Sequence, residues 1–259
     1  MITEAQIHSL SRRWGIDQVT IMREYLQILF LSHLYGLARS DKVFFKGGTA
    51  IRFLKASFRF SEDLDFTSTL PPEQVAVLFG RAVFGLSREA EGVGIEKFKV
   101  KKNSIISRIK HKAGKNAHSL GIHLEISVRE KPLTKKVSQI ETLLPISPYP
   151  IITHLSDEEI LSEKVRALLK RAKGRDLFDV WFLMTKEVKL NWNMVEKKMK
   201  FYGEGADFGH LVSKIQLFDE KKLVQDLAKF LPRRQRKLIP DLQANVIKRL
   251  EEIRPSLVK

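Results

Sequence analysis

"FKGGTAIRFLKASFRFSEDLDF", residues 45–66, joins a diglycine to a pair of aspartates within an otherwise apolar and basic stretch. Gly47 and Gly48 follow the apolar run KVFF, which is typical of a short strand that enters a turn. The residues after them, TAIRFLKA, have the pattern of a helix that begins at this turn. The run LDFTS, residues 64–68, is typical of a second strand. The stretch therefore predicts a strand, a glycine turn, a helix and a second strand, in that order.

The two aspartates fall on one face of the second predicted strand. Alternation along a strand sends Leu64 and Phe66 to one face and Asp63 and Asp65 to the other. Two carboxylates on one face repel each other unless a cation lies between them. Mg²⁺ takes oxygen ligands and usually keeps waters and substrate phosphates in its shell. The pair therefore predicts a site for Mg²⁺ or Mn²⁺ that carries a nucleoside triphosphate (NTP).

A third carboxylate occupies a similar position on a later predicted strand. In GIHLEISV, residues 121–128, Leu124 and Ile126 face a core, while Glu125 points to the opposite side with His123. If this strand neighbours the first pair, three carboxylates can hold two metal ions around a phosphate. Two metal ions of that kind clamp an in-line phosphoryl or nucleotidyl displacement.

The diglycine suits the phosphates of the same substrate. Gly47 and Gly48 leave backbone N–H groups unobstructed at the start of a helix, where the helix dipole favours an anion. The hydroxyl of Thr49 adds a donor. Three further residues flank the turn or the acids, and each either contacts phosphate or orients the strand. They are Lys46, Arg59 and Ser61.

The rest of the chain predicts an α/β (α+β) protein with a small mixed sheet, flanking helices and a C-terminal helical domain. Asp17 can cap a helix that runs to about Arg39, and Pro71 and Pro72 open another that runs to about Glu91. Strands are expected over residues 95–102, 104–112 and 121–130, and irregular or edge structure over 131–153. Ser156 can cap the first of a series of C-terminal helices. We expect domains over residues 1–150 and 151–259.

Composition restricts the partners. The chain has 259 residues, a formal net charge of +16 and no cysteine. The charge favours a polyanionic partner, either nucleic acid or an anionic membrane surface. The lack of cysteine excludes disulfides, thiolate metal sites and cysteine nucleophiles. The most apolar window, residues 25–38, is too short to span a bilayer and the N-terminus lacks a signal-peptide pattern, so we expect a cytoplasmic protein without a membrane partner.

The segment KGGTAIR…RFSEDLDF resembles the signature of the AbiEii/AbiGii-type toxin nucleotidyltransferases, in the polymerase-β-like superfamily. The diglycine, Thr49 and the Asp-x-Asp pair carry the resemblance, and Glu125 stands where the superfamily more often has aspartate. The resemblance implies metal-dependent transfer of a nucleoside monophosphate from an NTP to an acceptor, with the 3′ end of tRNA as that acceptor. It also implies a cognate antitoxin.

A later segment, SEKVRALLKRAKGRDLFDVWFL, resembles the family's helical lysine followed by an Arg-Asp-x-x-Asp motif. The resemblance implies that Lys164 contacts nucleotide phosphates and that Asp176, or alternatively Asp179, approaches the site. Without the resemblance, the residues alone favour an exposed basic helix with intrahelical ion pairs. Both interpretations stay open at this point.

Basic residues recur on two of the predicted strands. Paired strands would give a basic sheet surface near the predicted site, formed by Lys97, Lys99, Lys101, Arg108, Lys110 and Lys112. The run PRRQRK, residues 232–237, adds a second cluster. Such clusters bind phosphates in a salt-sensitive way, and the sparse aromatic residues favour structured RNA over single strands. Solvated charged faces explain each cluster as well.

Two alternative functions remain open. The same site could modify or phosphorylate a protein. The chain could also be a non-catalytic basic RNA-binding protein on a degenerate transferase scaffold, although a degenerate site has no reason to keep paired acids that repel each other.

Overall fold

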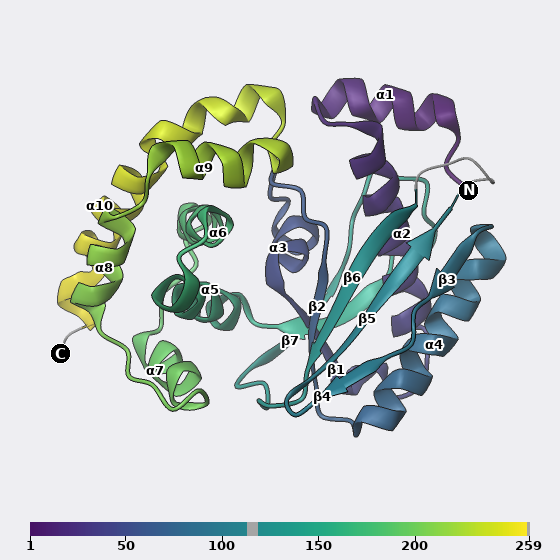
Figure 1. Ribbon diagram of the computed structural model, residues 1–259, viewed down its shortest axis with the longest axis horizontal. Helices are drawn as coiled ribbons and strands as arrows, with labels where there is room; N and C mark the ends of the chain where they lie inside the picture. The colour runs from purple at the N-terminus through teal and green to yellow at the C-terminus, as the bar shows by residue number, and fades with distance from the viewer. Residues whose placement is uncertain (113–118, 258–259) are drawn as a thin grey trace. The chain divides into compact units, whose positions relative to one another are not determined.

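The computed structural model describes residues 1–112 and 119–257 (Figure 1). The chain divides into two compact units, Met1–Leu155 and Ser156–Lys259. The first is a mixed α/β unit and the second is helical. This confirms the predicted fold class.

The first unit contains one eight-stranded sheet within the described residues. Its strands are β1 (Val43–Lys46), β2 (Leu64–Ser68), β3 (Val93–Ile95), β4 (Lys99–Lys101), β5 (Ser104–His111), β6 (Leu120–Ser127), β7 (Lys135–Gln139) and β8 (Ile151–Leu155). Its helices are α1 (Glu4–Trp14), α2 (Gln18–Tyr35), the 3₁₀ helix η1 (Ser40–Lys42), α3 (Gly47–Lys55) and α4 (Pro72–Glu89).

The sheet is mixed, with strand order β3-β5-β6-β2-β1-β8-β7 and β4 paired to β5. β2 lies at its centre, antiparallel to β1 and parallel to β6. β1 also pairs in parallel with β8. The predicted strand–helix–strand order of residues 42–68 is confirmed as β1, α3 and β2.

Helices α2 and α4 cover the face of the sheet that carries Phe66 (Figure 1). The ring of Phe66 meets Phe79 of α4 edge-on at 5.2 Å between centroids, and Phe30 of α2 lies 5.7 Å from Phe79. Leu64, Phe66 and Leu124 have no exposed surface. Because side chains alternate along a strand, Asp65 and Glu125 point to the opposite face.

Three local predictions differ from the structure. The strand expected over residues 95–102 is interrupted, so that β3 and β4 pair with different parts of β5. The stretch 131–153 contains the edge strand β7 but also the start of β8, which lies inside the sheet between β1 and β7. The first long helix ends at Tyr35 rather than near Arg39, and Arg39 itself has a left-handed φ of 71° that an α-helix cannot contain.

The second unit contains α5 (Asp157–Arg171), α6 (Gly174–Thr185), α7 (Trp192–Lys200), α8 (Phe208–Gln216), α9 (Glu220–Leu227), the 3₁₀ helices η2 (Ala228–Phe230) and η3 (Arg233–Leu238), and α10 (Ile239–Leu257). The predicted caps of α2 and α5 are confirmed: Asp17 accepts a hydrogen bond from the backbone N–H of Thr20, and Ser156 accepts one from that of Glu159. Their helices therefore begin where the sequence places them.

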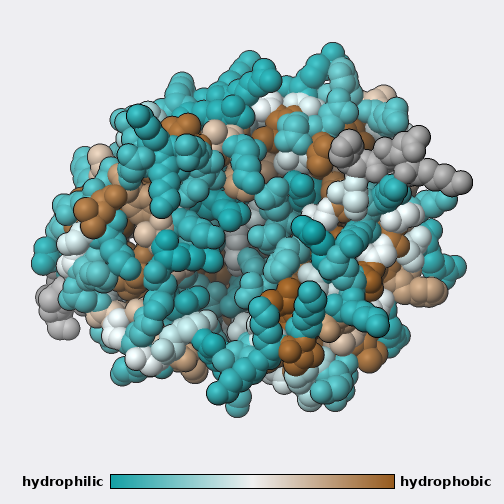
Figure 2. Space-filling view, in the orientation of Figure 1, coloured by the Kyte–Doolittle hydropathy of each residue, from teal (hydrophilic) through white to brown (hydrophobic). Residues whose placement is uncertain are grey.

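Hydrophilic residues cover most of the face shown in Figure 2, as expected for a chain in which 29% of residues are charged. Over the ranges that the structure describes, we find no helix with the length and apolarity that a membrane span needs.

Candidate functional site

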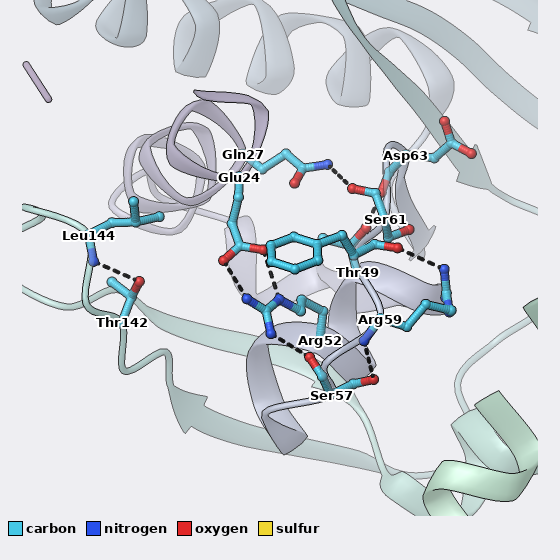
Figure 3. A network of polar contacts seen from close by, with 11 residues as sticks. Glu24, Gln27, Thr49, Arg52, Ser57, Arg59, Ser61, Asp63, Thr142 and Leu144 are labelled. Atoms are coloured by element: carbon cyan, nitrogen blue, oxygen red, sulfur yellow. Dashed lines mark hydrogen bonds and ion pairs between the residues drawn. The ribbon is translucent and has the colours of Figure 1, made fainter. Parts of the chain in front are cut away.

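Three predicted site residues form one row across the centre of the sheet. Lys46 of β1 pairs with Asp65 of β2, and Asp65 pairs with Glu125 of β6. The side chains of paired residues share a face, so all three lie on the face opposite Phe66. Asp63 precedes β2 by one residue, and its carboxylate extends away from the neighbouring side chains that Figure 3 labels.

The carboxylate of Asp65 lies directly against the diglycine. Helix α3 begins at Gly47, whose φ of 81° is in the left-handed region that favours glycine. A Cβ placed on Gly47 would lie 2.1 Å from Oδ2 of Asp65. Both the backbone conformation and the close approach of Asp65 therefore require glycine at position 47.

Arg59 covers the second glycine. A Cβ on Gly48 would lie 2.2 Å from Nη2 of Arg59 and 3.2 Å from the hydroxyl oxygen of Ser61. Arg59 is buried, and its Nη1 donates to the carbonyl of Phe60 at 3.0 Å. Gly48 is buried as well, whereas Gly47 stays partly exposed. Two of the flanking residues predicted from the sequence, Arg59 and Ser61, are thus brought to the start of α3.

The hydroxyl of Thr49 has a role within the fold. It donates a hydrogen bond to the backbone carbonyl of Asp63, and the residue is 1% exposed. The sequence predicts this hydroxyl as a phosphate donor, but its single proton is used to tie α3 to the segment that carries the acids. What Thr49 can still offer a ligand is its backbone N–H, in the first turn of α3.

A polar network that joins α3 and the following loop to α2 was not predicted from the sequence (Figure 3). Arg52 of α3 makes two parallel hydrogen bonds to Glu24 of α2, at 2.8 and 3.0 Å, and donates to the carbonyl of Ser57 at 2.5 Å. Gln27 of α2 donates to the carbonyl of Ser61 at 3.2 Å. These bonds fix the loop between α3 and β2. The available signal was that Glu24 and Gln27 interrupt a strongly apolar helix.

The carboxylates fit a hard divalent cation that arrives with a phosphate ligand. Asp63, Asp65 and Glu125 provide oxygen donors only, which is the chemistry that Mg²⁺ prefers. Among the described residues, however, no three Asp, Glu or His side chains are close enough to form a complete metal site. Mg²⁺ usually takes one or two carboxylates and completes its shell with water and substrate phosphates. The donor set agrees with that mode of binding.

Within the second unit, Lys164 joins two buried aspartates. Its Nζ lies 2.7 Å from Asp179 and 3.4 Å from Asp176, and Nε of Arg171 lies 2.8 Å from Asp176. Burial alone would raise the pKa of Asp176, but Lys164 and Arg171 outweigh it and lower the pKa to about 2. The interpretation as an exposed basic helix is wrong, because both aspartates are buried and the ion pairs join α5 to α6.

The predicted basic residues occupy different kinds of position. Lys99 and Lys101 lie on β4, and Arg108 and Lys110 lie on β5. Lys97 lies in the break between β3 and β4, and Lys112 follows β5. The run PRRQRK falls largely within η3 of the second unit.

Comparison with known proteins gives one family and several related folds. The family model described as "Nucleotidyl transferase AbiEii toxin, Type IV TA system" matches residues 29–254. No curated protein matches the chain. Among solved structures, MenT4, a nucleotidyltransferase toxin from Mycobacterium tuberculosis H37Rv, has a TM-score of 0.62 at 18% identity, with 96% of this chain and 89% of that one covered.

Two structures from Helicobacter pylori share the fold as well. JHP933 has a TM-score of 0.53 at 23% identity, with 93% of this chain and 97% of that one covered. A putative nucleotidyltransferase has a TM-score of 0.55 at 22% identity, with 92% and 99% covered. At these identities the likeness establishes the fold alone.

Proposed function

The chain belongs to the AbiEii family of nucleotidyltransferase toxins, and from this premise we propose that it transfers a nucleoside monophosphate from an NTP to an RNA hydroxyl, with the 3′ end of tRNA as the acceptor. The acceptor oxygen attacks the α-phosphorus and forms a new P–O bond. The bond from that phosphorus to the bridging oxygen of the β-phosphate breaks, and pyrophosphate leaves. The proton of the acceptor hydroxyl passes to a nearby base or to water.

One observation carries this proposal: the carboxylate of Asp65 lies against the backbone of Gly47 at the first turn of α3. The first N–H groups of a helix donate hydrogen bonds to an anion, whereas the carboxylate of Asp65 repels an anion. A phosphate can approach both groups only together with a cation. The arrangement therefore suits a metal-bound triphosphate better than a bare anion.

The carboxylates and the turn have separate tasks in this proposal. Asp63, Asp65 and Glu125 would each offer carboxylate oxygens to Mg²⁺ or Mn²⁺ that binds together with the triphosphate, and the ion would neutralise charge at the phosphates and lower the pKa of the acceptor hydroxyl. The backbone N–H groups of Gly47 and Gly48 orient the triphosphate.

The side chains around the turn support it. The guanidinium of Arg59, held over Gly48, adds positive charge beside the phosphates, and Lys46 and Ser61 border the same turn. The hydroxyl of Thr49 keeps the acid-bearing segment in place.

The two later residues enter by family resemblance. We assign Lys164 to a phosphate of the nucleotide and Asp176 to the positioning of that lysine. Their ion pair supports the second role, because a buried aspartate with a pKa of about 2 stays charged at neutral pH and holds the ammonium group in place. The net charge of +16 supports RNA as the acceptor, and action on tRNA requires a cytoplasmic location. The toxin family also implies a cognate antitoxin as a partner.

The test is transfer of label from each of the four α-labelled NTPs, with Mg²⁺, to total tRNA and to added proteins. The native protein and Asp41→Ala, which removes an exposed carboxylate outside the site, should label RNA. Asp65→Ala should lose about a thousandfold in rate, since metal-bound charge stabilisation is worth several kcal/mol. The mass of the adduct distinguishes a nucleotide from a phosphate. Labelled protein, or RNA binding without any transfer, would refute the proposal in favour of one of the two alternative functions.

A further inference from the structure

The face of the sheet that carries Asp65 and Glu125 continues from the proposed site to exposed basic side chains. Glu125 of β6 pairs with Ile106 of β5, and Ile106 pairs with Lys99 of β4. Lys99 therefore shares the transverse row of Asp65 and lies three strands away from it. At about 4.8 Å between neighbouring strands, their Cα atoms are about 14 Å apart.

A second basic residue lies closer to the acids. Arg108 of β5 pairs with His123 of β6, two residues from Glu125, so it points to the same face. Arg108 is exposed, as are Lys99 and Lys101. The face is thus acidic at its centre, where Asp65 and Glu125 lie, and basic toward β4.

Glu96 lies among the basic side chains of this region, and they lower its pKa. Its carboxylate pairs with Lys110 at 2.5 Å. The hydrogen bond from Lys110 lowers the pKa of Glu96, and the charges of Arg108 and Lys99 lower it further. One acid therefore partly neutralises Lys110, while Arg108 and Lys99 keep charge that a polyanion can use.

Arg108 is held in a seat formed by a glycine. A Cβ on Gly121 would lie 2.7 Å from Nε and 3.1 Å from Cζ of Arg108, so the guanidinium lies across β6 over the backbone of Gly121. A side chain on Gly121 would displace it. A guanidinium presents its donors in one plane, which suits a phosphate.

Resting on the function proposed above, we propose that the exposed basic side chains of β4 and β5 bind the phosphate backbone of the acceptor RNA just before its reacting end, with Arg108 in its glycine seat and Lys99 as the main contacts. A stacked strand advances about 3.4 Å per nucleotide, so 14 Å corresponds to about four nucleotides. The reacting hydroxyl can then lie at Asp65 while earlier phosphates lie over β5 and β4. Contacts of this kind set the register of the RNA without reading its sequence.

The test measures RNA binding apart from catalysis, in the Asp65→Ala background. The probe is a synthetic hairpin RNA with a single-stranded 3′ end, titrated between about 50 and about 200 mM salt. Arg108→Ala should reduce the slope of log K against log salt by about one unit, because one phosphate contact is lost. Gly121→Ala should weaken binding several-fold although it removes no charge. Arg81→Ala is the matched control: it removes an exposed arginine from α4, on the opposite side of the sheet, and should leave the slope unchanged.

Two outcomes would overturn the proposal. Equal effects of Arg108→Ala and Arg81→Ala would mean that RNA does not bind this face. A loss of NTP affinity as large as the loss of RNA affinity, measured with a fluorescent NTP analogue, would mean that Arg108 belongs to the triphosphate site. If the native protein transfers no nucleotide but the slopes change as expected, the proposed function fails and the RNA surface stands.

Discussion

Substitution of Gly47 by alanine tests the contact on which the proposed site depends. The new Cβ would lie 2.1 Å from Oδ2 of Asp65, whereas ordinary contacts begin at 3.4 Å, so the oxygen would have to retreat by about 1.3 Å. Rotation of the carboxylate does not suffice, because Cβ of Asp65 would also be only 2.8 Å away. A misplacement of about 1 Å in a catalytic group costs about a hundredfold in rate. We therefore expect Gly47→Ala to lower kcat for nucleotide transfer about a hundredfold.

The same substitution also strains the backbone, and a control removes that ambiguity. A non-glycine residue in the left-handed region costs about 1–2 kcal/mol of stability. Gly203 has a φ of 73° with no other atom within 4 Å of an added Cβ, so Gly203→Ala carries the backbone cost without the collision. Urea unfolding should show a loss for both variants, whereas transfer assays should show a loss for Gly47→Ala alone. If Gly47→Ala retained activity within about threefold of the native protein, the argument from this contact would be refuted.

Three further predictions concern the buried charges. Asp176 contributes stability through its lowered pKa, and this contribution should be present above about pH 4 and lost as the pH falls toward 2. Over this range, the free energy of urea unfolding should fall by about 2 kcal/mol more for the native protein than for Asp176→Asn. Parallel pH curves for the two proteins would contradict this. Lys198→Met should destabilise the second unit by about 3–5 kcal/mol, because it leaves buried Glu159 without the ammonium group that now lies 2.7 Å away. Adding Glu159→Leu should recover part of this loss. A double variant that is no more stable than Lys198→Met would count against this. Arg52→Lys should lower the free energy of thermal unfolding by about 1–3 kcal/mol and also slow nucleotide transfer, because a lysine cannot make both hydrogen bonds to Glu24. A loss of stability without slower transfer would mean that this network does not support the site.

Several features of the site could be predicted because they depend on neighbouring residues. Alternation assigned Asp65 to one face and Phe66 to the other, and the register of β2 agrees with it. The caps at Asp17 and Ser156 were predicted for the same reason, since each accepts a hydrogen bond from a backbone group three residues away. The roles of the acids in metal binding and catalysis stay predictions, which the transfer assay tests.

Other features depend on residues that are distant in the sequence. The pairing of Arg52 with Glu24 spans 28 residues, and the seat of Arg108 needs β5 and β6 in one specific register. The position of β8 beside β1 is another example: its sequence is short and apolar, and nothing local distinguishes an interior strand from an edge strand.

The sequence by itself determined the strand–helix–strand order of residues 42–68 and the shared face of Asp65 and Glu125, because these follow from local periodicity. Only the tertiary structure decided that Asp65 lies against Gly47, that Arg59 covers Gly48 and that Glu125 shares a row with Asp65. The physical reason is that strand register and close backbone approach are set by the packing of the whole sheet, in which each pairing is stabilised by contacts that no short segment contains.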